Sequence, residues 1–324
     1  MSQLFSNNTG SLNTTNINFT VTCTIDRSNI LAWLSPLDPR SRHRDIQGHR
    51  VENVGEWILQ TEAFRSWYAS SEGGVSDNEV LFCYGDPGVG KTYVRYHNKD
   101  EPRGMEENGQ VLTRSNASSL VIDRLCDQAR GQNSIVACFY FDYAAQNEQS
   151  PTNMLSSLLK QLVCGQEIIP EEISRAYQDQ QNAIGGRELQ LSDIVKMLQT
   201  ISSKKATFIC IDALDECVEG HRVKILSSLN RILQGSPGTR IFITGRPHVL
   251  PEIGRRLTRR ITSISISPKR DDIIGYLQSK LDEDTNPDAM NSSLEADIMK
   301  KIPKDVSEMY VEVTALGKLP QAIR

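Results

Sequence analysis

A glycine-rich turn that directly follows an apolar run constrains this chain more than any other feature. The run from Val80 to Tyr84 has the length and composition of a buried strand. The segment from Gly85 to Thr92 comes next and has the pattern G-x-x-x-x-G-K-[ST]. Glycine adopts backbone angles that a Cβ would forbid, so such a turn can aim its N–H groups at a phosphate. The sequence therefore predicts a phosphate-binding loop at the end of a buried strand.

The side chains that close this loop suit a nucleotide with a magnesium ion. Lys91 supplies a mobile positive charge for the β- and γ-phosphates, and the hydroxyl of Thr92 can ligate Mg²⁺. A helix that starts here adds the positive end of its dipole. The residues expected to bind the nucleotide are Gly85, Asp86, Pro87, Gly88, Val89, Gly90, Lys91 and Thr92.

A second apolar run ends in carboxylates. Asp212 follows the run from Thr207 to Ile211, and we expect it to hold Mg²⁺ at the end of a neighbouring strand, opposite Thr92. Asp215 and Glu216 come about one turn later, where a carboxylate can orient or deprotonate an attacking water. The alternative is an acidic helix start that a favourable dipole interaction explains on its own.

A third apolar run, Arg240 to Thr244, is followed by Arg246. A cation at the tip of this strand is expected beside the γ-phosphate, where it offsets charge in the transition state. The candidate catalytic residues are therefore Asp215, Glu216 and Arg246, and the candidate metal ligands are Thr92 and Asp212. The alternative for Arg246 is a surface arginine.

The order of apolar runs and amphipathic stretches predicts the fold class. Five strand-length runs alternate with helical patterns, which is typical of a parallel sheet covered on both faces. We expect a three-layer α/β/α fold with a five-stranded, mainly parallel sheet. Four segments are predicted: an Asn/Thr-rich disordered tail at 1–28, a helical linker at 29–76, the nucleotide-binding domain at 77–268 and a helical segment at 269–324.

Composition limits the cellular compartment and the partners that we expect for this chain. The net charge of −4 gives no general attraction to nucleic acid, and no apolar run approaches the roughly 18 residues of a membrane span. Seven cysteines without a C-x-x-C pair suit a reducing compartment. We expect a cytoplasmic protein without a nucleic-acid partner. The Asn-rich tail has a second interpretation, since uncharged Asn-rich segments can stack into cross-β ladders.

Three motifs together carry a resemblance. The sequences GDPGVGKT, FICIDALDE and RIFITGRPH, in this order and spacing, resemble the NACHT-type P-loop domain of fungal STAND proteins, in its nephrocystin-3-like N-terminal form that often precedes ankyrin repeats. The segment from Ile30 to Trp57 resembles the linker that leads into this domain. The resemblance covers roughly residues 28–315.

The resemblance implies a switch that rests with ADP, exchanges it for ATP and then oligomerises. In fungi such proteins are associated with self/non-self recognition and programmed cell death. The N-terminal tail would stand where relatives carry an effector or signalling motif, and so would contact a downstream effector. The implied cofactors are ATP or ADP and Mg²⁺.

The chain departs from the family pattern in two places. Residues 93–116 separate Thr92 from the helix that should follow it, and they contain Pro102 and a dense set of charges. We hypothesise a retained intron, because Thr-Tyr-Val-Arg can be encoded by a fungal-type 5′ splice sequence; the alternative is an exposed loop that leaves the phosphate-binding loop intact. The winged helix and the repeats of relatives are also absent, as in a short form or a truncated gene model.

Three functions remain open at this level. The first is a nucleotide switch with slow or conditional hydrolysis. The second is a non-catalytic interaction fragment whose nucleotide site is impaired by residues 93–116. The third is a work-performing ATPase, which the lack of a Leu-Ser-Gly-Gly-Gln element disfavours. No guanine-reading Asn/Thr-Lys-x-Asp segment is present, and this favours adenine.

Overall fold

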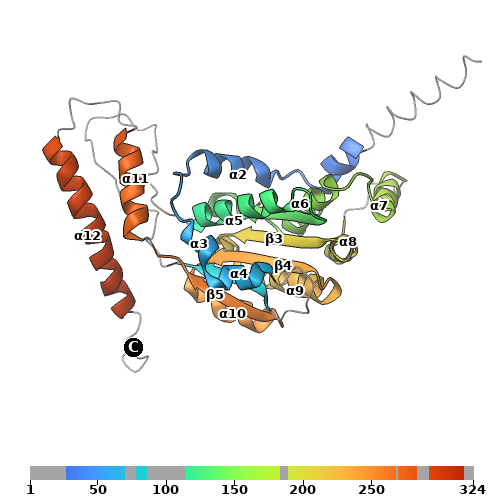
Figure 1. Ribbon diagram of the computed structural model, residues 1–324. Coiled ribbons are helices and arrows are strands. Elements are labelled where there is room, and N and C mark those ends of the chain that lie inside the picture. The colour runs from blue at the N-terminus through green and yellow to red at the C-terminus, as the bar shows by residue number, and fades with distance from the viewer. Residues whose placement is uncertain are drawn as a thin grey trace, which may run out of the picture.

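A five-stranded sheet forms the centre of the molecule (Figure 1). The computed structural model describes residues 27–69, 78–85, 114–182, 189–267, 269–282 and 292–316. Most of the predicted tail at 1–28 and of the segment at 93–116 therefore lies outside the described residues. The strands are β1 (Asn78–Tyr84), β2 (Ser134–Tyr140), β3 (Ala206–Asp212), β4 (Thr239–Gly245) and β5 (Arg260–Ser265).

The sheet has the order β2-β3-β4-β1-β5, and all four pairings are parallel. The predicted five-stranded, mainly parallel sheet is confirmed. One expectation is wrong: β3, which ends in Asp212, is not the neighbour of β1, because β4 lies between them. Parallel strands are joined by crossovers, so neighbours along the chain need not be neighbours in the sheet.

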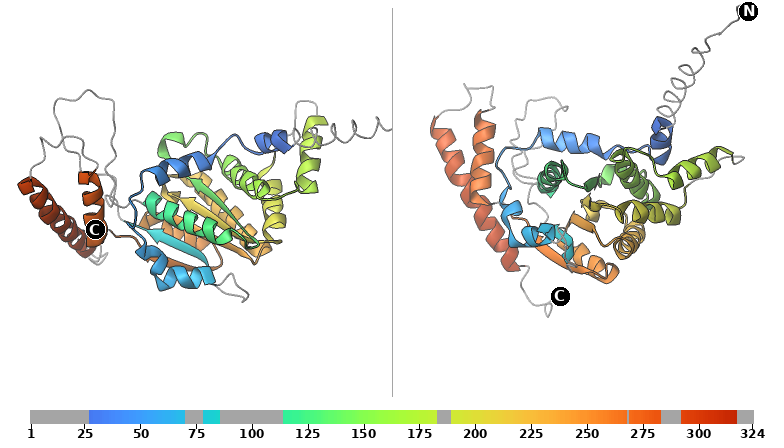
Figure 2. Two further views of the ribbon diagram at one scale, coloured as in Figure 1. Left: turned by 45° about the horizontal axis from the view of Figure 1, so that its top comes forward. Right: turned by 45° about the vertical axis from the view of Figure 1, so that its right-hand side comes forward.

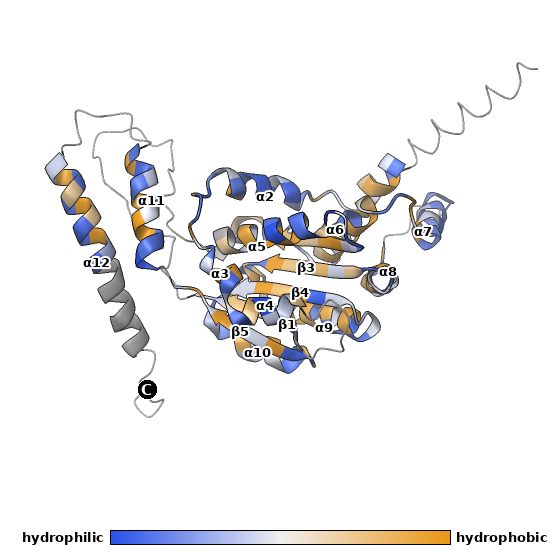
Figure 3. Cartoon of the chain, viewed as in Figure 1, coloured by the Kyte–Doolittle hydropathy of each residue, from blue (hydrophilic) through white to orange (hydrophobic). Residues whose placement is uncertain are grey.

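Alternate residues of each central strand face two separate cores. Val80 and Phe82 of β1 pack in one core, whereas Leu81 and Cys83 pack in the other. Phe242 of β4 follows the same alternation, since its neighbours on the strand face the opposite side. Burial on both faces explains why these strands are continuous apolar runs. The orange strands among bluer helices in Figure 3 show this pattern.

Helices cover both faces of the sheet (Figure 2). The face with Leu81 packs against α2 (Pro39–Gly48), α3 (Trp57–Gln60), α4 (Glu62–Ala69) and α5 (Arg114–Ala129). The face with Val80 packs against α6 (Pro151–Cys164), α7 (Glu171–Asn182), α8 (Leu191–Ser202), α9 (Glu219–Gly235) and α10 (Leu250–Arg256). Helices α11 (Arg270–Asp282) and α12 (Ser292–Leu316) pack against each other beside this body.

The helical linker is held on α5 by a cluster of polar side chains around Asp123. The Nε2 atom of His43 lies 3.0 Å from Asp123 Oδ1, and Arg50 Nη1 lies 2.7 Å from Asp123 Oδ2. Burial raises the pKa of Asp123, but the hydrogen bonds from His43 and Arg50 outweigh it, and the net pKa lies below its ordinary value. The other ring nitrogen of His43 lies 2.7 Å from the hydroxyl of Tyr140, whose pKa is raised by burial.

We expect Asp123→Asn to lower the free energy of unfolding by about 1–2 kcal/mol at neutral pH, because the partners of the carboxylate lose its charge. A carboxylate whose pKa is lowered in the folded state contributes its full stabilisation above the unfolded-state pKa of about 3.9 and loses it as pH falls through the folded value. The difference between the wild type and Asp123→Asn should therefore shrink below about pH 4. Urea unfolding over this pH range measures it. A difference that stayed constant down to about pH 2.5 would contradict the assignment.

A second buried carboxylate joins the linker to the C-terminal helices. Asp272, in the first turn of α11, is 7% exposed. Its Oδ1 accepts the backbone N–H of Gly55 at 2.9 Å, and its Oδ2 accepts Nε1–H of Trp57 at 3.0 Å. The linker turn needs unusual backbone angles, with φ of 63° at Asn53 and 85° at Gly55. Lys269 Nζ lies 4.4 Å from the centroid of the Trp57 ring, which adds a cation–π contact.

Candidate functional site

The residues predicted to form a site lie at the carboxyl ends of three adjacent strands. Gly85 follows β1, Gly245 ends β4 and Asp212 ends β3, and these strands are neighbours in the order β1-β4-β3. The register pairs Tyr84 with Gly245 and Ile211 with Ile243, so the three strand ends are level. Carboxyl ends of parallel strands are the usual place for ligands in open α/β sheets.

Asp212 is buried and held by two hydroxyl groups. Its carboxylate accepts hydrogen bonds at Oδ1 from Ser118 Oγ at 2.5 Å and from Thr244 Oγ1 at 2.6 Å. Asp212 is 2% exposed, so water does not replace these donors. Ser118 comes from α5 and Thr244 from β4, so the carboxylate is fixed from both sides of its strand end. Hydroxyl donors that orient a carboxylate in this way are typical of the groups that support a metal ligand.

The chain turns sharply after Asp212. Ala213 has φ of 53°, in the left-handed region, at a cost of roughly 1–2 kcal/mol for a residue with a Cβ. Its backbone N–H donates to Thr244 Oγ1 at 3.0 Å, which holds the turn. The turn leads into the 3₁₀ helix η2 (Leu214–Glu216), which presents both acidic candidates near the same edge. Strained backbone of this kind is concentrated at functional sites.

Asp215 and Arg246 form an ion pair. Arg246 Nε lies 3.0 Å from Asp215 Oδ2, and the backbone N–H of Arg246 donates to Asp215 Oδ1 at 3.2 Å. The Asp215 side chain is 3% exposed and that of Arg246 is 41% exposed, so the aspartate is buried behind the arginine. Gly245 fits the close packing beside this pair, since a Cβ there would lie 3.0 Å from Val249 Cγ2 and 3.3 Å from Phe82 Cε2.

Glu216 lies on the β2 side of the strand ends. Its Oε2 accepts the backbone N–H of Tyr143 at 3.2 Å, and its carbonyl oxygen accepts Nε2–H of Gln146 at 2.6 Å. Glu216 is thus held by the segment that follows β2, apart from the Asp215–Arg246 pair. The two acids are adjacent in the sequence, but in η2 their side chains have different partners.

The phosphate-binding residues Asp86 to Thr92 lie outside the described residues, so their predicted roles, including that of Thr92 as a metal ligand, stay predictions. The fit of Mg²⁺ can be tested at Asp212, whose carboxylate oxygens are the hard ligands that this ion prefers. No cluster of three acidic, histidine or cysteine side chains suited to a metal ion occurs within the described ranges. A phosphate-bound Mg²⁺ takes one or two protein carboxylates, so Asp212 fits this use.

Ser118 and Thr244 are site residues that the motif analysis did not single out. Both hydroxyls are buried, with Ser118 1% and Thr244 0% exposed. The available signal for Thr244 was a polar residue at the end of the apolar run that starts at Arg240. For Ser118 the signal was a serine pair, Ser118 and Ser119, on the otherwise apolar face of a helix. Neither signal indicated the partner.

A family model matches most of the described body. Residues 53–103 and 113–246 match the model described as Nephrocystin 3, N-terminal. The match includes the Gly85–Thr92 segment, Asp212 and Arg246, and it is interrupted only between residues 103 and 113. No curated protein matches the chain.

Solved structures resemble the chain at low sequence identity. The Walker-type ATPase PABY2304 of Pyrococcus abyssi is 12% identical over 80% of this chain and 68% of its own, with a TM-score of 0.42. The Aeropyrum pernix ORC1 protein in complex with DNA is 14% identical over 73% of this chain, with a TM-score of 0.44. A chain of Drosophila ORC bound to DNA is 12% identical over 76% of this chain, with a TM-score of 0.40. The chain spans 53% of the length of each of these two ORC chains.

These structures correct one expectation. Two of them are complexes with DNA, so the expected absence of a nucleic-acid partner is wrong as an exclusion. It rested on the net charge of −4, which averages over the whole surface and does not report a local basic patch. In the part of the chain that the structure describes, no helix combines the length and apolarity needed to cross a membrane.

Proposed function

Because the chain belongs to the Nephrocystin 3, N-terminal family, we propose that it is an ATP/ADP-binding switch module of the NACHT type with slow or conditional hydrolysis. The observation that carries the proposal is the buried carboxylate of Asp212, which Ser118 and Thr244 orient. Asp212 ends β3, and a single strand, β4, lies between β3 and the strand β1 that leads into Gly85. The motif resemblance extends the proposal to a signalling role in a fungal NLR-like protein.

In this proposal each part of the strand-end site has a separate task. The loop from Gly85 to Thr92 binds the phosphates through its N–H groups and Lys91. Asp212 and Thr92 hold Mg²⁺, which when bound neutralises phosphate charge. Arg246 faces the γ-phosphate, and its exposed side chain supports that role.

The two acids after Asp212 divide into a positioning residue and a candidate base. Asp215 is buried and paired through both oxygens with Arg246, so we assign it the orientation of that arginine. Glu216 is the candidate that orients or deprotonates the attacking water, because its partners come from the β2 side and do not include Arg246. These roles agree with nucleotide hydrolysis in general, in which catalysis comes mainly from positioning the reacting groups and stabilising the charge on the phosphates.

The direct test is to identify the nucleotide that the purified chain retains. We expect denaturation of the full chain to release ADP or ATP, identified by mass and retention time, and we expect added ATP to bind only weakly when Mg²⁺ is chelated. A chain that releases no nucleotide and binds neither ADP nor Mg²⁺-ATP would overturn the proposal. That result would favour a non-catalytic interaction fragment.

Ser118→Ala tests the positioning role of the hydroxyl on α5. We expect it to weaken Mg²⁺-dependent ATP binding about tenfold, because groups that orient a metal ligand contribute on this scale. Binding in EDTA should not change. Ser119→Ala is the matched control, since the adjacent hydroxyl accepts from Arg50 at 3.1 Å and does not contact Asp212. An equal loss in both variants, measured by calorimetry, would assign the effect to the helix and not to Asp212.

A further inference from the structure

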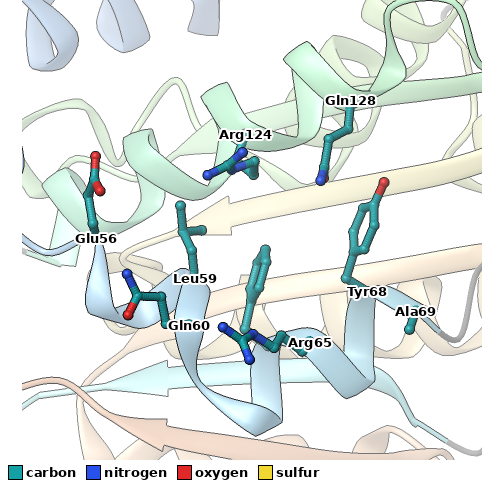
Figure 4. A pocket seen from close by; sticks show the side chains of 9 residues that line it. Glu56, Leu59, Gln60, Arg65, Tyr68, Ala69, Arg124 and Gln128 are labelled. Carbon is teal, nitrogen blue, oxygen red and sulfur yellow. The ribbon is translucent and has the colours of Figure 1, made fainter.

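A groove between α4 and α5 lies outside the site described above. Its volume is about 390 Å³, within the range of ligand pockets, and it opens on the sheet face that carries Leu81. Arg124 and Gln128 line it from the second half of α5 (Figure 4). Gln128 is ten residues beyond Ser118, which corresponds to roughly 15 Å along a helix. The groove is therefore distinct from the strand-end site.

The floor of the groove is apolar. Leu59 of α3 and the rings of Phe64 and Tyr68 of α4 form it. The Tyr68 ring lies nearly parallel to Phe64, at 11°, and to Phe208, at 10°, with centroid distances of 6.3 and 5.9 Å. The groove therefore offers the apolar surface of these side chains to an occupant.

The walls carry two guanidinium groups from different helices. Arg65 of α4 and Arg124 of α5 are both exposed, and neither makes an ion pair or side-chain hydrogen bond within the described ranges. Other arginines of the chain do have such partners, as Arg222 has in Glu252 and Arg246 in Asp215. Glu56 is the one acidic residue among those that line the groove, so the two arginines leave the lining with a net positive charge (Figure 4). Two guanidinium groups that flank an apolar floor favour an occupant with carboxylates.

Gln128 adds a neutral recognition group. Its Oε1 is buried and has no hydrogen-bond donor in the described structure. The amide nitrogen of Gln128 points into the groove, so an occupant meets its N–H groups (Figure 4). A carboxamide N–H donor matches the C=O of a peptide backbone.

We propose that this groove binds an acidic peptide segment of a partner protein. Its carboxylates pair with Arg65 and Arg124, an apolar side chain packs on Leu59 and Tyr68, and Gln128 Nε2–H donates to a backbone carbonyl oxygen. The match of the carboxamide to a peptide bond, together with charges on opposite walls, favours a peptide over a small anion. The inference does not depend on nucleotide binding.

The test uses the full chain and a fluorescein-labelled eight-residue peptide of alternating glutamate and leucine. We expect saturable binding by fluorescence anisotropy, with Arg65→Glu and Arg124→Glu each weakening it about tenfold. Gln128→Leu, which keeps the volume and removes the amide donor, should weaken it about fivefold. Arg256→Glu is the matched control, because Arg256 is an exposed arginine of α10 on the other face of the sheet and should leave binding unchanged.

Several outcomes would overturn the proposal. The first is no saturable binding of this peptide; the second is binding that the two groove substitutions do not weaken. Equal weakening by Arg256→Glu would mean general electrostatic attraction. Full competition by free glutamate at the peptide's own concentration would identify a small-anion site instead. Loss of a self-associated species in Arg65→Glu, seen by analytical ultracentrifugation without peptide, would assign the groove to a second copy. Thermal midpoints of the three arginine variants should stay at the wild-type value, since these arginines are exposed.

Discussion

Asp212→Asn is expected to weaken the binding of Mg²⁺-ATP about 100-fold or more, while the affinity for ATP in EDTA stays at the wild-type value. The amide has the shape of the carboxylate, and its oxygen can still accept from Ser118 and Thr244 at the position where Oδ1 now lies. What the substitution removes is the negative charge that a hard cation requires. The effect should therefore appear only when the metal is present. Titration calorimetry with and without Mg²⁺ separates the two affinities.

A matched control exists on the same edge of the sheet. Asp142 follows β2, and its side chain accepts the backbone N–H of Ala144 at 2.9 Å as the cap of the 3₁₀ helix η1 (Tyr143–Ala145). Asparagine caps a helix nearly as well as aspartate, so Asp142→Asn should leave both affinities unchanged. An Asp212→Asn variant that loses affinity equally in EDTA would indicate damage to the fold. An unchanged Mg²⁺-ATP affinity would remove Asp212 from the metal site.

Four of the five strands could be predicted from the sequence because they are largely buried on both faces of the sheet. The edge strand β5 is an exception, since its residues are mostly exposed or half-buried. All five predicted runs, which include residues 135–140 and 261–266 besides the three named above, lie within two residues of the observed bounds. Helices with weak apolar patterns were missed. In α7 only Ile173 is buried, and α10 is a short helix with the exposed Arg255 and Arg256 in its last turn. The core contacts of α7 come only from Ile173 and the half-buried Ala176 and Tyr177, which is too short an apolar pattern to predict a helix.

Strand order and side-chain partners could not be predicted in the same way. The sequence places carboxylates and an arginine after apolar runs, and parallel strands bring those ends to one edge. It does not say that β4 separates β1 from β3, since that depends on how each crossover packs. Ser118 donates to an aspartate 94 residues away, and Asp215 accepts from a backbone N–H 31 residues away. Contacts between residues so far apart in the sequence depend on how the strands are aligned with one another, and this alignment exists only in the folded sheet.

The same limit applies to the junction between the linker and α11. The sequence predicts a helical linker and a C-terminal helical segment, but nothing in it pairs Asp272 with Trp57, 215 residues away. In the structure this one carboxylate binds two N–H groups of the linker turn. A single substitution of Asp272 therefore removes both of these hydrogen bonds at once.

Asp272→Ala is expected to lower the free energy of unfolding by about 2–4 kcal/mol, because the N–H groups of Gly55 and Trp57 lose their acceptor in a largely buried place. The thermal midpoint should fall by several degrees, and hydrogen exchange should accelerate in α11 more than in the sheet. Asp271→Ala is the matched control, since Asp271 is the exposed neighbour in the same first turn. If the two variants lose the same stability, the effect belongs to the helix dipole and not to the linker contact. If Asp272→Ala melts like the wild type, the linker does not depend on this carboxylate, and α11 is held by its buried apolar residues Ile273, Tyr276 and Leu277.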